Sequence, residues 1–249
     1  YKERLCTVID VNEPSRKIAI KNFVRNPIFC AFGVNNAPTF RDYEEFLENV
    51  DAVYIASPNE THFEYAKKAI EAGKHVLSEK PLSFTKKESE VLYTSAKEKG
   101  VVLMEAVKAA YCPGFQQLIN VAKSGKIGDI VDVEASFTRL ADPLSRERTD
   151  AEYGGAFLEF GPSVLVPVIK LMGKDYTSVT FDSIYDGNGV DLYTKADIRY
   201  DNGFATVKTG VGVKTEGQLV VSGTKGYIIA QSPVSYTHLR AHETGRNLV

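Results

Sequence analysis

The stretch 76–81, Val-Leu-Ser-Glu-Lys-Pro, constrains the fold of this chain more than any other part of the sequence. It follows Gly73, and a short apolar run bounded by Gly and Pro is typical of a strand that is buried on both faces of a parallel sheet. Proline cannot continue the hydrogen-bonded ladder, so we expect the strand to end at Pro81. Glu79 and Lys80 are therefore predicted at the carboxyl end of a strand, where open α/β sheets bind their ligands.

Apolar runs alternate with amphipathic segments through the first 104 residues. The pattern predicts strands at 5–9, 29–34, 52–56, 76–81 and 101–104, and helices at 15–23, 43–47, 61–72 and 85–99. Such alternation is typical of βαβ units and a parallel sheet. Polar residues follow three of these strands, namely Asp10, then Ser57 and Asn59, then Glu79 and Lys80. The strand ends would line one crevice, so we predict a Rossmann-type nucleotide-binding domain over residues 1–104.

The pattern becomes rich in strands after residue 104. Helices are predicted at 113–124 and 162–172, and strands at 131–138, 178–185, 192–200, 205–211, 217–222 and 227–230. Residues 131–138 alternate between apolar and polar side chains, which is typical of a sheet with one covered face. Asp201-Asn202-Gly203 is a strong hairpin signal. The predicted fold class is therefore α/β, a Rossmann-type parallel sheet followed by an α+β domain, over residues 105–233, with a large, mainly antiparallel open sheet.

Both ends of the chain differ from what a complete two-domain protein of this kind would carry. A Rossmann unit begins with a strand, a Gly-x-Gly-x-x-Gly loop and a helix, and an acid after the second strand meets the ribose. Asp10 holds the position of that acid and no glycine loop precedes it, so we expect the first βα unit to be missing. Residues 234–249 resemble a translated sequencing adapter, and we expect them to be non-native, as a fusion scar would be.

The tail also contains His238, His242 and Glu243, which imitate a helical zinc-binding pair. Because we attribute the tail to the adapter, no metal site is expected. The net charge of −2 gives no reason to expect nucleic acid or an anionic membrane as a partner. Three cysteines without a C-x-x-C spacing indicate a reducing, cytoplasmic compartment.

Two segments together carry a family resemblance: Val-Tyr-Ile-Ala-Ser-Pro-Asn-Glu-Thr-His at 53–62 and Ala-Gly-Lys-His-Val-Leu-Ser-Glu-Lys-Pro-Leu at 72–82. With Met-Glu-Ala at 104–106, Gly-Lys-Ile-Gly-Asp at 125–129 and Gly-Gly-Ala-Phe-Leu-Glu at 154–159, the chain resembles the Gfo/Idh/MocA family of NAD(P)-dependent oxidoreductases. The resemblance implies hydride transfer between nicotinamide and a carbinol or carbonyl carbon of a sugar, polyol or related compound. It also implies a homo-oligomer that forms through the C-terminal sheet, whose other face borders the substrate cleft.

The resemblance assigns the catalytic lysine to Lys80. This ammonium group would hydrogen-bond the reacting oxygen and help to relay its proton, and burial beside the nicotinamide would lower its pKa. Glu79 would lie near the nicotinamide ribose, and Pro81 would follow a cis peptide bond that directs Lys80. The resemblance also places a second set of residues near the cofactor: Ser57, Pro58 and Asn59 in one turn, His62 at a helix start, and Glu105.

The choice between NAD and NADP depends on residues near the ribose. An acid such as Asp10 favours NAD because it accepts a hydrogen bond from the 2′-hydroxyl and repels a 2′-phosphate. Arg16 and Lys17 lie close enough in the sequence to keep NADP open.

The second domain departs from the family pattern at the proton-transfer position. After the Gly-Gly pair many members carry an Asp and, four residues later, a His or Tyr, whereas this chain has Glu159 and Ser163. Glutamate can replace aspartate as the acid, but serine cannot replace histidine as a base near neutral pH without further activation. Tyr111 or Tyr153 could supply the donor instead. The alternative function is a non-catalytic, dinucleotide-binding sensor or regulatory homologue.

Overall fold

The computed structural model describes residues 42–231 and 238–243 of the 249-residue chain. The chain divides into two compact units, residues 1–106 and 107–249. The strands predicted at 5–9 and 29–34, the helix predicted at 15–23, and Asp10, Arg16 and Lys17 lie outside the described residues.

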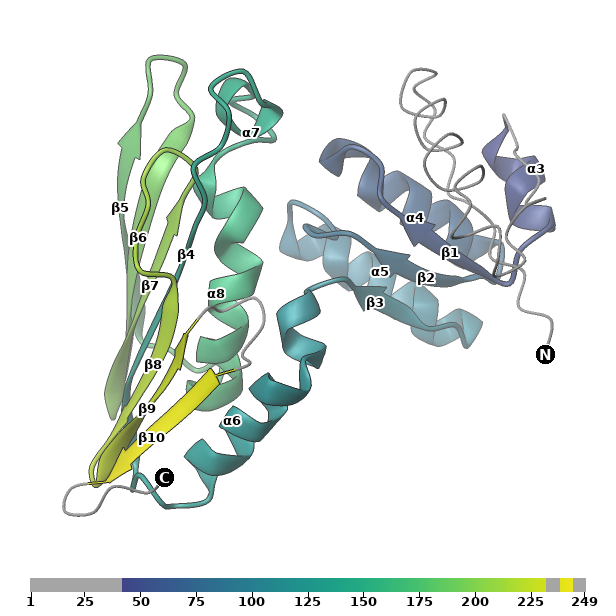
Figure 1. The fold of residues 1–249 in the computed structure, drawn as a ribbon. Helices are drawn as coiled ribbons and strands as arrows, with labels where there is room; N and C mark the ends of the chain where they lie inside the picture. The colour runs from purple at the N-terminus through teal and green to yellow at the C-terminus, as the bar shows by residue number, and fades with distance from the viewer. Residues whose placement is uncertain (1–41, 232–237, 244–249) are drawn as a thin grey trace, which may run out of the picture. The chain divides into compact units, whose positions relative to one another are not determined.

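The first unit contains a three-stranded parallel sheet in the order β1-β2-β3 (Figure 1). Its strands are β1 (Ala52–Ile55), β2 (His75–Ser78) and β3 (Leu103–Glu105), and its α-helices are α3 (Tyr43–Glu48), α4 (His62–Glu71) and α5 (Lys86–Lys99). A short 3₁₀ helix, η2 (Asn59–Thr61), precedes α4. The predicted alternation of strands and helices is confirmed over this range, and the strands are parallel because helices connect them.

Local sequence sets where α5 begins and ends. Thr85 accepts a hydrogen bond from the Glu88 N–H, and the Glu88 side chain accepts one from the Thr85 N–H, which forms a capping box. Gly100 ends the helix at φ +68°, a conformation that glycine adopts without steric cost. The predicted helix at 85–99 is therefore confirmed to within one residue.

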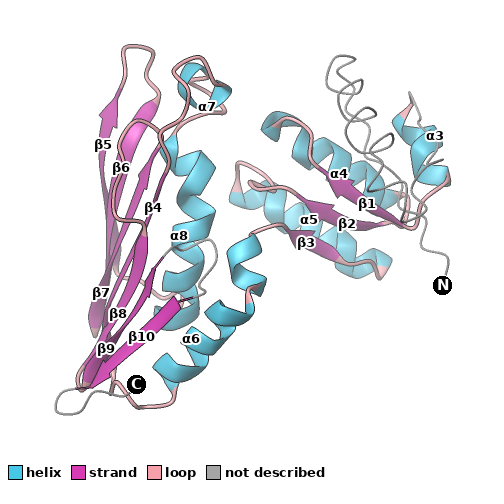
Figure 2. Cartoon of the chain, viewed as in Figure 1, coloured by secondary structure: helices cyan, strands magenta, loops and turns pink. Residues whose placement is uncertain are grey.

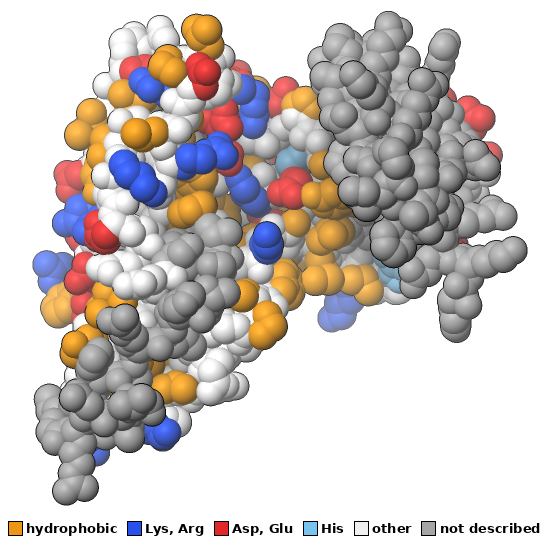
Figure 3. All heavy atoms as spheres, viewed as in Figure 1, with side chains coloured by type: hydrophobic (Ala, Val, Ile, Leu, Met, Phe, Trp, Pro, Cys, Tyr) orange, Lys and Arg blue, Asp and Glu red, His pale blue; other side chains and the backbone are white. Residues whose placement is uncertain are grey.

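The helices α4 and α5 pack on the same face of the β1–β3 sheet. Their buried side chains and those of the sheet form one apolar core: Val53, Ile55, Ala66, Ala69, Ile70, Val76, Leu92 and Ala96. The prediction that the strand after Gly73 is buried on both faces is wrong, because Leu77 is 38% exposed. Tyr54 and Met104 are partly exposed on the same face as Leu77, and Figure 3 shows hydrophobic side chains over this sheet.

The second unit contains a seven-stranded sheet in the order β10-β9-β8-β4-β7-β6-β5 (Figure 2). The strands are β4 (Ile130–Thr138), β5 (Ser178–Tyr185), β6 (Asp191–Tyr200), β7 (Gly203–Gly210), β8 (Gln218–Gly223), β9 (Gly226–Gln231) and β10 (His238–Glu243). Only the β4–β7 pair is parallel among these described strands. The predicted fold class is thus confirmed, as is the two-residue Asp201-Asn202 hairpin between β6 and β7.

The long helix α8 (Ala156–Met172) covers one face of this sheet, with α6 (Pro113–Lys123) beside it (Figure 1). Two short helices, η3 (Lys108–Tyr111) and α7 (Arg146–Thr149), complete the unit. The core between helices and sheet includes Leu118, Val133, Val164, Val168, Val207 and Leu219. No helix among residues 42–231 and 238–243 is long and apolar enough to cross a membrane.

The predicted start of α8 at residue 162 is wrong, because the helix begins six residues earlier, at Ala156. Pro162 lies inside the helix, where it merely lacks an N–H to donate. Ala156, Phe160 and Val164 are all buried along one stripe of α8. Burial of that stripe outweighs the hydrogen bond that proline cannot make.

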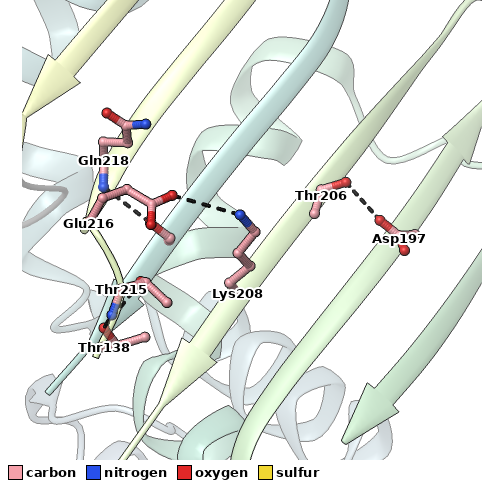
Figure 4. Close-up of polar contacts among 8 residues, drawn as sticks. Thr138, Asp197, Thr206, Lys208, Thr215, Glu216 and Gln218 are labelled. Carbon is pink, nitrogen blue, oxygen red and sulfur yellow. Dashed lines mark hydrogen bonds and ion pairs between the residues drawn. The ribbon is translucent and has the colours of Figure 1, made fainter. Parts of the chain in front are cut away.

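The opposite face of the sheet carries polar and charged side chains (Figure 4). The Thr206 hydroxyl donates to Asp197 Oδ1 at 2.7 Å, and Lys208 Nζ lies 3.7 Å from Glu216 Oε1. Residues 238–243 pair with β9 as β10, and their adapter origin stays a prediction.

Candidate active site

The carboxyl ends of β1, β2 and β3 meet at one edge of the parallel sheet. Ile55 pairs with Ser78, and Ser78 with Glu105, so the three strands end level with one another. The Glu79 N–H donates to the Ile55 carbonyl at 2.7 Å, and the Ala106 N–H donates to the Ser78 carbonyl at 2.7 Å. This edge brings together eight of the predicted site residues: Ser57, Pro58, Asn59, His62, Glu79, Lys80, Pro81 and Glu105.

The turn after β2 presents Lys80. The Lys80–Pro81 peptide bond is cis, which confirms the geometry that the resemblance implied. Lys80 and Glu79 are both partly exposed, whereas Ser78 directly before them is fully buried. The side chains of Glu79 and Lys80 are therefore accessible at the edge, while Ser78, where the turn begins, lies in the protein interior.

Glu79 has a partner that the sequence reasoning missed. The Tyr54 hydroxyl donates a hydrogen bond to Glu79 Oε1. Partial burial, and then the neighbouring Glu79 carboxylate, raise the pKa of Tyr54 to about 12. The sequence carries no local signal for this pairing, because residues 52–55 are apolar or aromatic throughout; in the structure Val53 and Ile55 are buried and Tyr54 faces outward.

The turn after β1 is closed by its own side chains. The Thr61 hydroxyl donates to the Pro58 carbonyl at 2.7 Å, and the Ser57 hydroxyl lies 2.6 Å from Thr61 Oγ1. Because the Thr61 hydroxyl has only one proton, the Ser57 hydroxyl must be the donor to it. Asn59 is buried at 8% exposure, so the turn is anchored in the protein.

His62 lies between the two turns and is fully buried. Its Nδ1 is 2.8 Å from the Pro81 carbonyl oxygen, and its Nε2 is 2.9 Å from the Ser57 carbonyl oxygen. Glu105, at the end of β3, contacts the turn after β2, because its Oε1 accepts a hydrogen bond from the Leu82 N–H at 2.9 Å.

Glu159 and Ser163 belong to the second unit, where both are partly buried on α8. Glu159 lies in the first turn of the helix, and its N–H donates to the Gly155 carbonyl at 3.1 Å. Asp191 holds this helix start, since its Oδ2 accepts from the Phe157 N–H at 2.9 Å. Tyr111, at the end of η3, is 56% exposed.

A metal centre has no support in the described part of the chain. No group of three or more His, Cys, Asp or Glu side chains that could hold a metal ion occurs there. The arrangement at the sheet edge is instead one lysine, two carboxylates of which Glu79 is paired with a tyrosine, a buried imidazole, and a hydrogen-bonded polar turn.

Two family models match the chain. The model for the oxidoreductase family with an NAD-binding Rossmann fold matches residues 5–107, and the model for the GFO/IDH/MocA C-terminal domain matches residues 115–229. The chain belongs to the Gfo/Idh/MocA oxidoreductase family. Its first unit is the NAD(P)-binding Rossmann domain of that family, and its second unit is the family's C-terminal domain.

Individual Gfo/Idh/MocA relatives agree with this assignment. The chain is 32% identical over 192 residues to the uncharacterized oxidoreductase YhhX of Escherichia coli, an alignment that covers 76% of this chain and 55% of YhhX. It is 32% identical over 206 residues to the scyllo-inositol 2-dehydrogenase (NADP(+)) IolU of Bacillus subtilis, with 78% of this chain and 62% of IolU covered. The chain thus spans less than two thirds of the length of these relatives.

A solved structure shares the fold. The aldose–aldose oxidoreductase of Caulobacter crescentus, complexed with glycerol, matches with a TM-score of 0.81 over 98% of this chain and 74% of that chain. The sequences are 21% identical, so this likeness is one of fold alone.

Proposed function

We propose that the protein transfers a hydride between a nicotinamide cofactor and a carbinol or carbonyl carbon of a sugar, polyol or related compound. The observation that carries this proposal is the turn of Glu79, Lys80 and Pro81, which stands at the carboxyl end of a central parallel strand with its base buried. Ligands bind at this end of open α/β sheets.

The residues at the edge fit the nicotinamide end of the cofactor. Ser57, Pro58 and Asn59 form a hydrogen-bonded turn on one side, and the Glu79 carboxylate, oriented by Tyr54, is a hydrogen-bond acceptor suited to a ribose hydroxyl. Pro81 fixes the chain direction after Lys80, and Asp10 is proposed to read the adenosine ribose. The bound cofactor would supply or accept the hydride.

Lys80 is the proposed catalytic residue. An ammonium group can donate to the substrate oxygen, stabilise the charge that develops there, and move a proton to or from it. Glu159 is proposed as a second catalytic group, an acid on the first turn of α8 that takes part in proton transfer.

Support for the substrate class comes from a relative. IolU is named as a dehydrogenase of scyllo-inositol, a polyol with adjacent hydroxyl groups, and it uses NADP(+). We therefore propose a sugar-like or polyol substrate, with NAD or NADP as cofactor. A cytoplasmic location remains a proposal from the cysteine usage.

We also propose that the protein forms a homo-oligomer through the sheet face that α8 leaves open. Exposed apolar side chains project from this face, Ile184 at 58%, Phe204 at 52% and Tyr227 at 39%. Arg199 lies over the Phe204 ring, with 5.3 Å between the guanidinium carbon and the ring centroid. Burying such side chains against a second copy of the chain would remove their apolar surface from water, which supports the proposal.

One observation favours the alternative, a non-catalytic dinucleotide-binding sensor. Ser163 stands where many relatives carry a His or Tyr, and a serine hydroxyl does not act as a base near neutral pH by itself. A sensor would bind the cofactor and turn nothing over.

The test follows nicotinamide absorbance in the full-length protein, with NAD and NADP, against a panel of sugars, inositols and polyols. Lys80→Met should lower kcat by about 10²–10⁴-fold, the range for loss of a general acid or base. Lys74→Met is the matched control, because Lys74 precedes β2 at the opposite, amino end of the same strand. Cofactor binding without turnover in either protein would support the sensor, and turnover that survives Lys80→Met would refute the catalytic role.

A further inference from the structure

One peptide group at the candidate active site has a side chain within hydrogen-bond distance of each of its two polar atoms. The carbonyl oxygen of Pro81 lies 2.8 Å from His62 Nδ1, and the N–H of Leu82 donates to Glu105 Oε1 at 2.9 Å. These two atoms belong to the single peptide unit that follows Lys80–Pro81. His62 reaches it from the β1 side of the turn and Glu105 from the end of β3.

The surroundings show that these contacts lie inside the protein. His62 is fully buried and Leu82 is 3% exposed. The second ring nitrogen of His62 is 2.9 Å from the Ser57 carbonyl, so the imidazole links the turn after β1 to the turn after β2. Both ring nitrogens therefore face main-chain oxygens, and neither faces the edge where a ligand would lie.

We propose that His62 and Glu105 are positioning residues that grip the Pro81–Leu82 peptide and thereby fix the turn that presents Lys80. They act on cofactor and substrate only through that turn. The inference rests on the proposed catalytic role of Lys80. In it, His62 and Glu105 do not contact the cofactor directly but hold the turn that presents Lys80.

The two residues act through different chemistry. Carbonyl oxygens only accept hydrogen bonds, so an N–H of the imidazole must donate to them; the neutral ring donates to one and the cation to both. Glu105 contributes an acceptor oxygen, which the side chain of glutamine also offers. Glu105→Gln should therefore keep the grip, whereas Glu105→Leu should lose it.

Amide hydrogen exchange, resolved by residue in the full-length protein, tests the grip without any turnover. Glu105→Leu and His62→Phe should each speed exchange of the Leu82 N–H by about tenfold or more, as local opening becomes easier, and Glu105→Gln should leave it unchanged. If His62→Phe does not fold, His62→Leu serves in its place, since leucine likewise has no side-chain N–H to donate.

The chain offers a matched histidine control. His75 begins β2, and its Nδ1 accepts from the Val102 N–H at 2.9 Å. His75→Phe should speed exchange of the Val102 N–H and leave that of the Leu82 N–H unchanged. His62→Phe should speed exchange of the Leu82 N–H and leave that of the Val102 N–H unchanged. Unchanged exchange at Leu82 in both Glu105→Leu and the His62 variant would overturn the proposal.

Kinetics then test the link to Lys80. Glu105→Leu and His62→Phe should lower kcat about tenfold or more with little change in the KM of the cofactor, because the interaction is realised in the transition state. In a Lys80→Met background the same substitutions should have no further effect, since coupled groups are not additive. An equal loss in both backgrounds, or a raised cofactor KM in Glu105→Gln, would overturn the positioning role. Absence of turnover in the unmutated protein would refute the proposed function instead, and the exchange rates alone would then decide the grip.

Discussion

Replacing Gly155 by alanine tests how the start of α8 is held. Gly155 has φ +96° and ψ 161°, a region that is almost restricted to glycine. A Cβ atom built there would lie 2.0 Å from Asp191 Oδ1, far inside van der Waals contact. That carboxylate accepts from the Phe157 N–H and the Thr194 hydroxyl, so it cannot move away without giving up both hydrogen bonds.

The expected cost has two parts. The strained backbone costs about 1–3 kcal/mol, and loss of the carboxylate that caps the helix costs about 0.5–2 kcal/mol. We therefore expect Gly155→Ala to lower the free energy of unfolding by about 1.5–5 kcal/mol.

Gly173 provides a matched control at the other end of the same helix. Its backbone is nearly the same, with φ +88° and ψ −173°, but a Cβ there meets nothing within 4 Å. Gly173→Ala should thus cost only the backbone part, about 1–3 kcal/mol. In an Asp191→Ala background the Cβ at position 155 no longer meets a carboxylate, so the two substitutions should then cost the same.

The assay is urea denaturation followed by far-UV circular dichroism, because the chain contains no Trp for fluorescence. Equal costs for Gly155→Ala and Gly173→Ala in the unmutated background would refute the argument. So would a difference that persists after Asp191→Ala, because the cause would then lie elsewhere than in that carboxylate.

Three further predictions concern the first unit. The pKa of Tyr54 is raised in the folded protein from its ordinary value of 10 to about 12. Its contribution to the free energy of unfolding is therefore complete below pH 10 and is lost as the pH rises through the folded pKa. Tyr54→Phe should remove this loss of stability between pH 10 and about 12. Unfolding free energies measured across that pH range decide this, and identical profiles for the two proteins would contradict it. Thr85→Ala should cost about 1 kcal/mol by breaking the capping box of α5, whereas Thr94→Ala, exposed on the same helix, should cost nothing. Leu92→Ala should cost about 2–5 kcal/mol in the same denaturation assay, because Leu92 is fully buried between α5 and the sheet; a cost below that of Thr85→Ala would place Leu92 outside the core.

The elements that the sequence predicted well are those whose signals are local. The helix at 85–99 has its cap at Thr85 and its stop at Gly100, and the β6–β7 hairpin has its turn at Asp201 and Asn202. Each of these signals acts within a few residues, so no knowledge of the tertiary structure was needed.

The errors arose where distant packing decided the outcome. Leu77 was expected to be buried because its strand is apolar, but α4 and α5 cover only the face opposite it. The helix predicted from residue 162 begins at Ala156 instead, because the buried stripe from Ala156 continues the helix through Pro162.

The candidate site likewise combines residues that the sequence predicted with contacts that it could not. The motif residues around Lys80 reach one edge because strands of a parallel sheet end together, which spacing alone predicts. The pairing of Tyr54 with Glu79 and the contacts of His62 depend on the register of β1 against β2, across separations of 25 and 19 residues. No local pattern encodes that register.

Ser163 places more of the proposed proton transfer on Lys80. Four residues before it on α8, Glu159 retains an acid, but a serine hydroxyl near neutral pH neither takes up nor releases the substrate proton as a histidine would. In the proposed reaction, proton transfer would then depend on Lys80 and Glu159. A lysine with such a role needs a fixed direction, because misplacement by about 1 Å can cost two orders of magnitude in rate. The double hold on the peptide directly after Lys80–Pro81 meets that requirement, and a sensor that only binds the cofactor would have no comparable need for it.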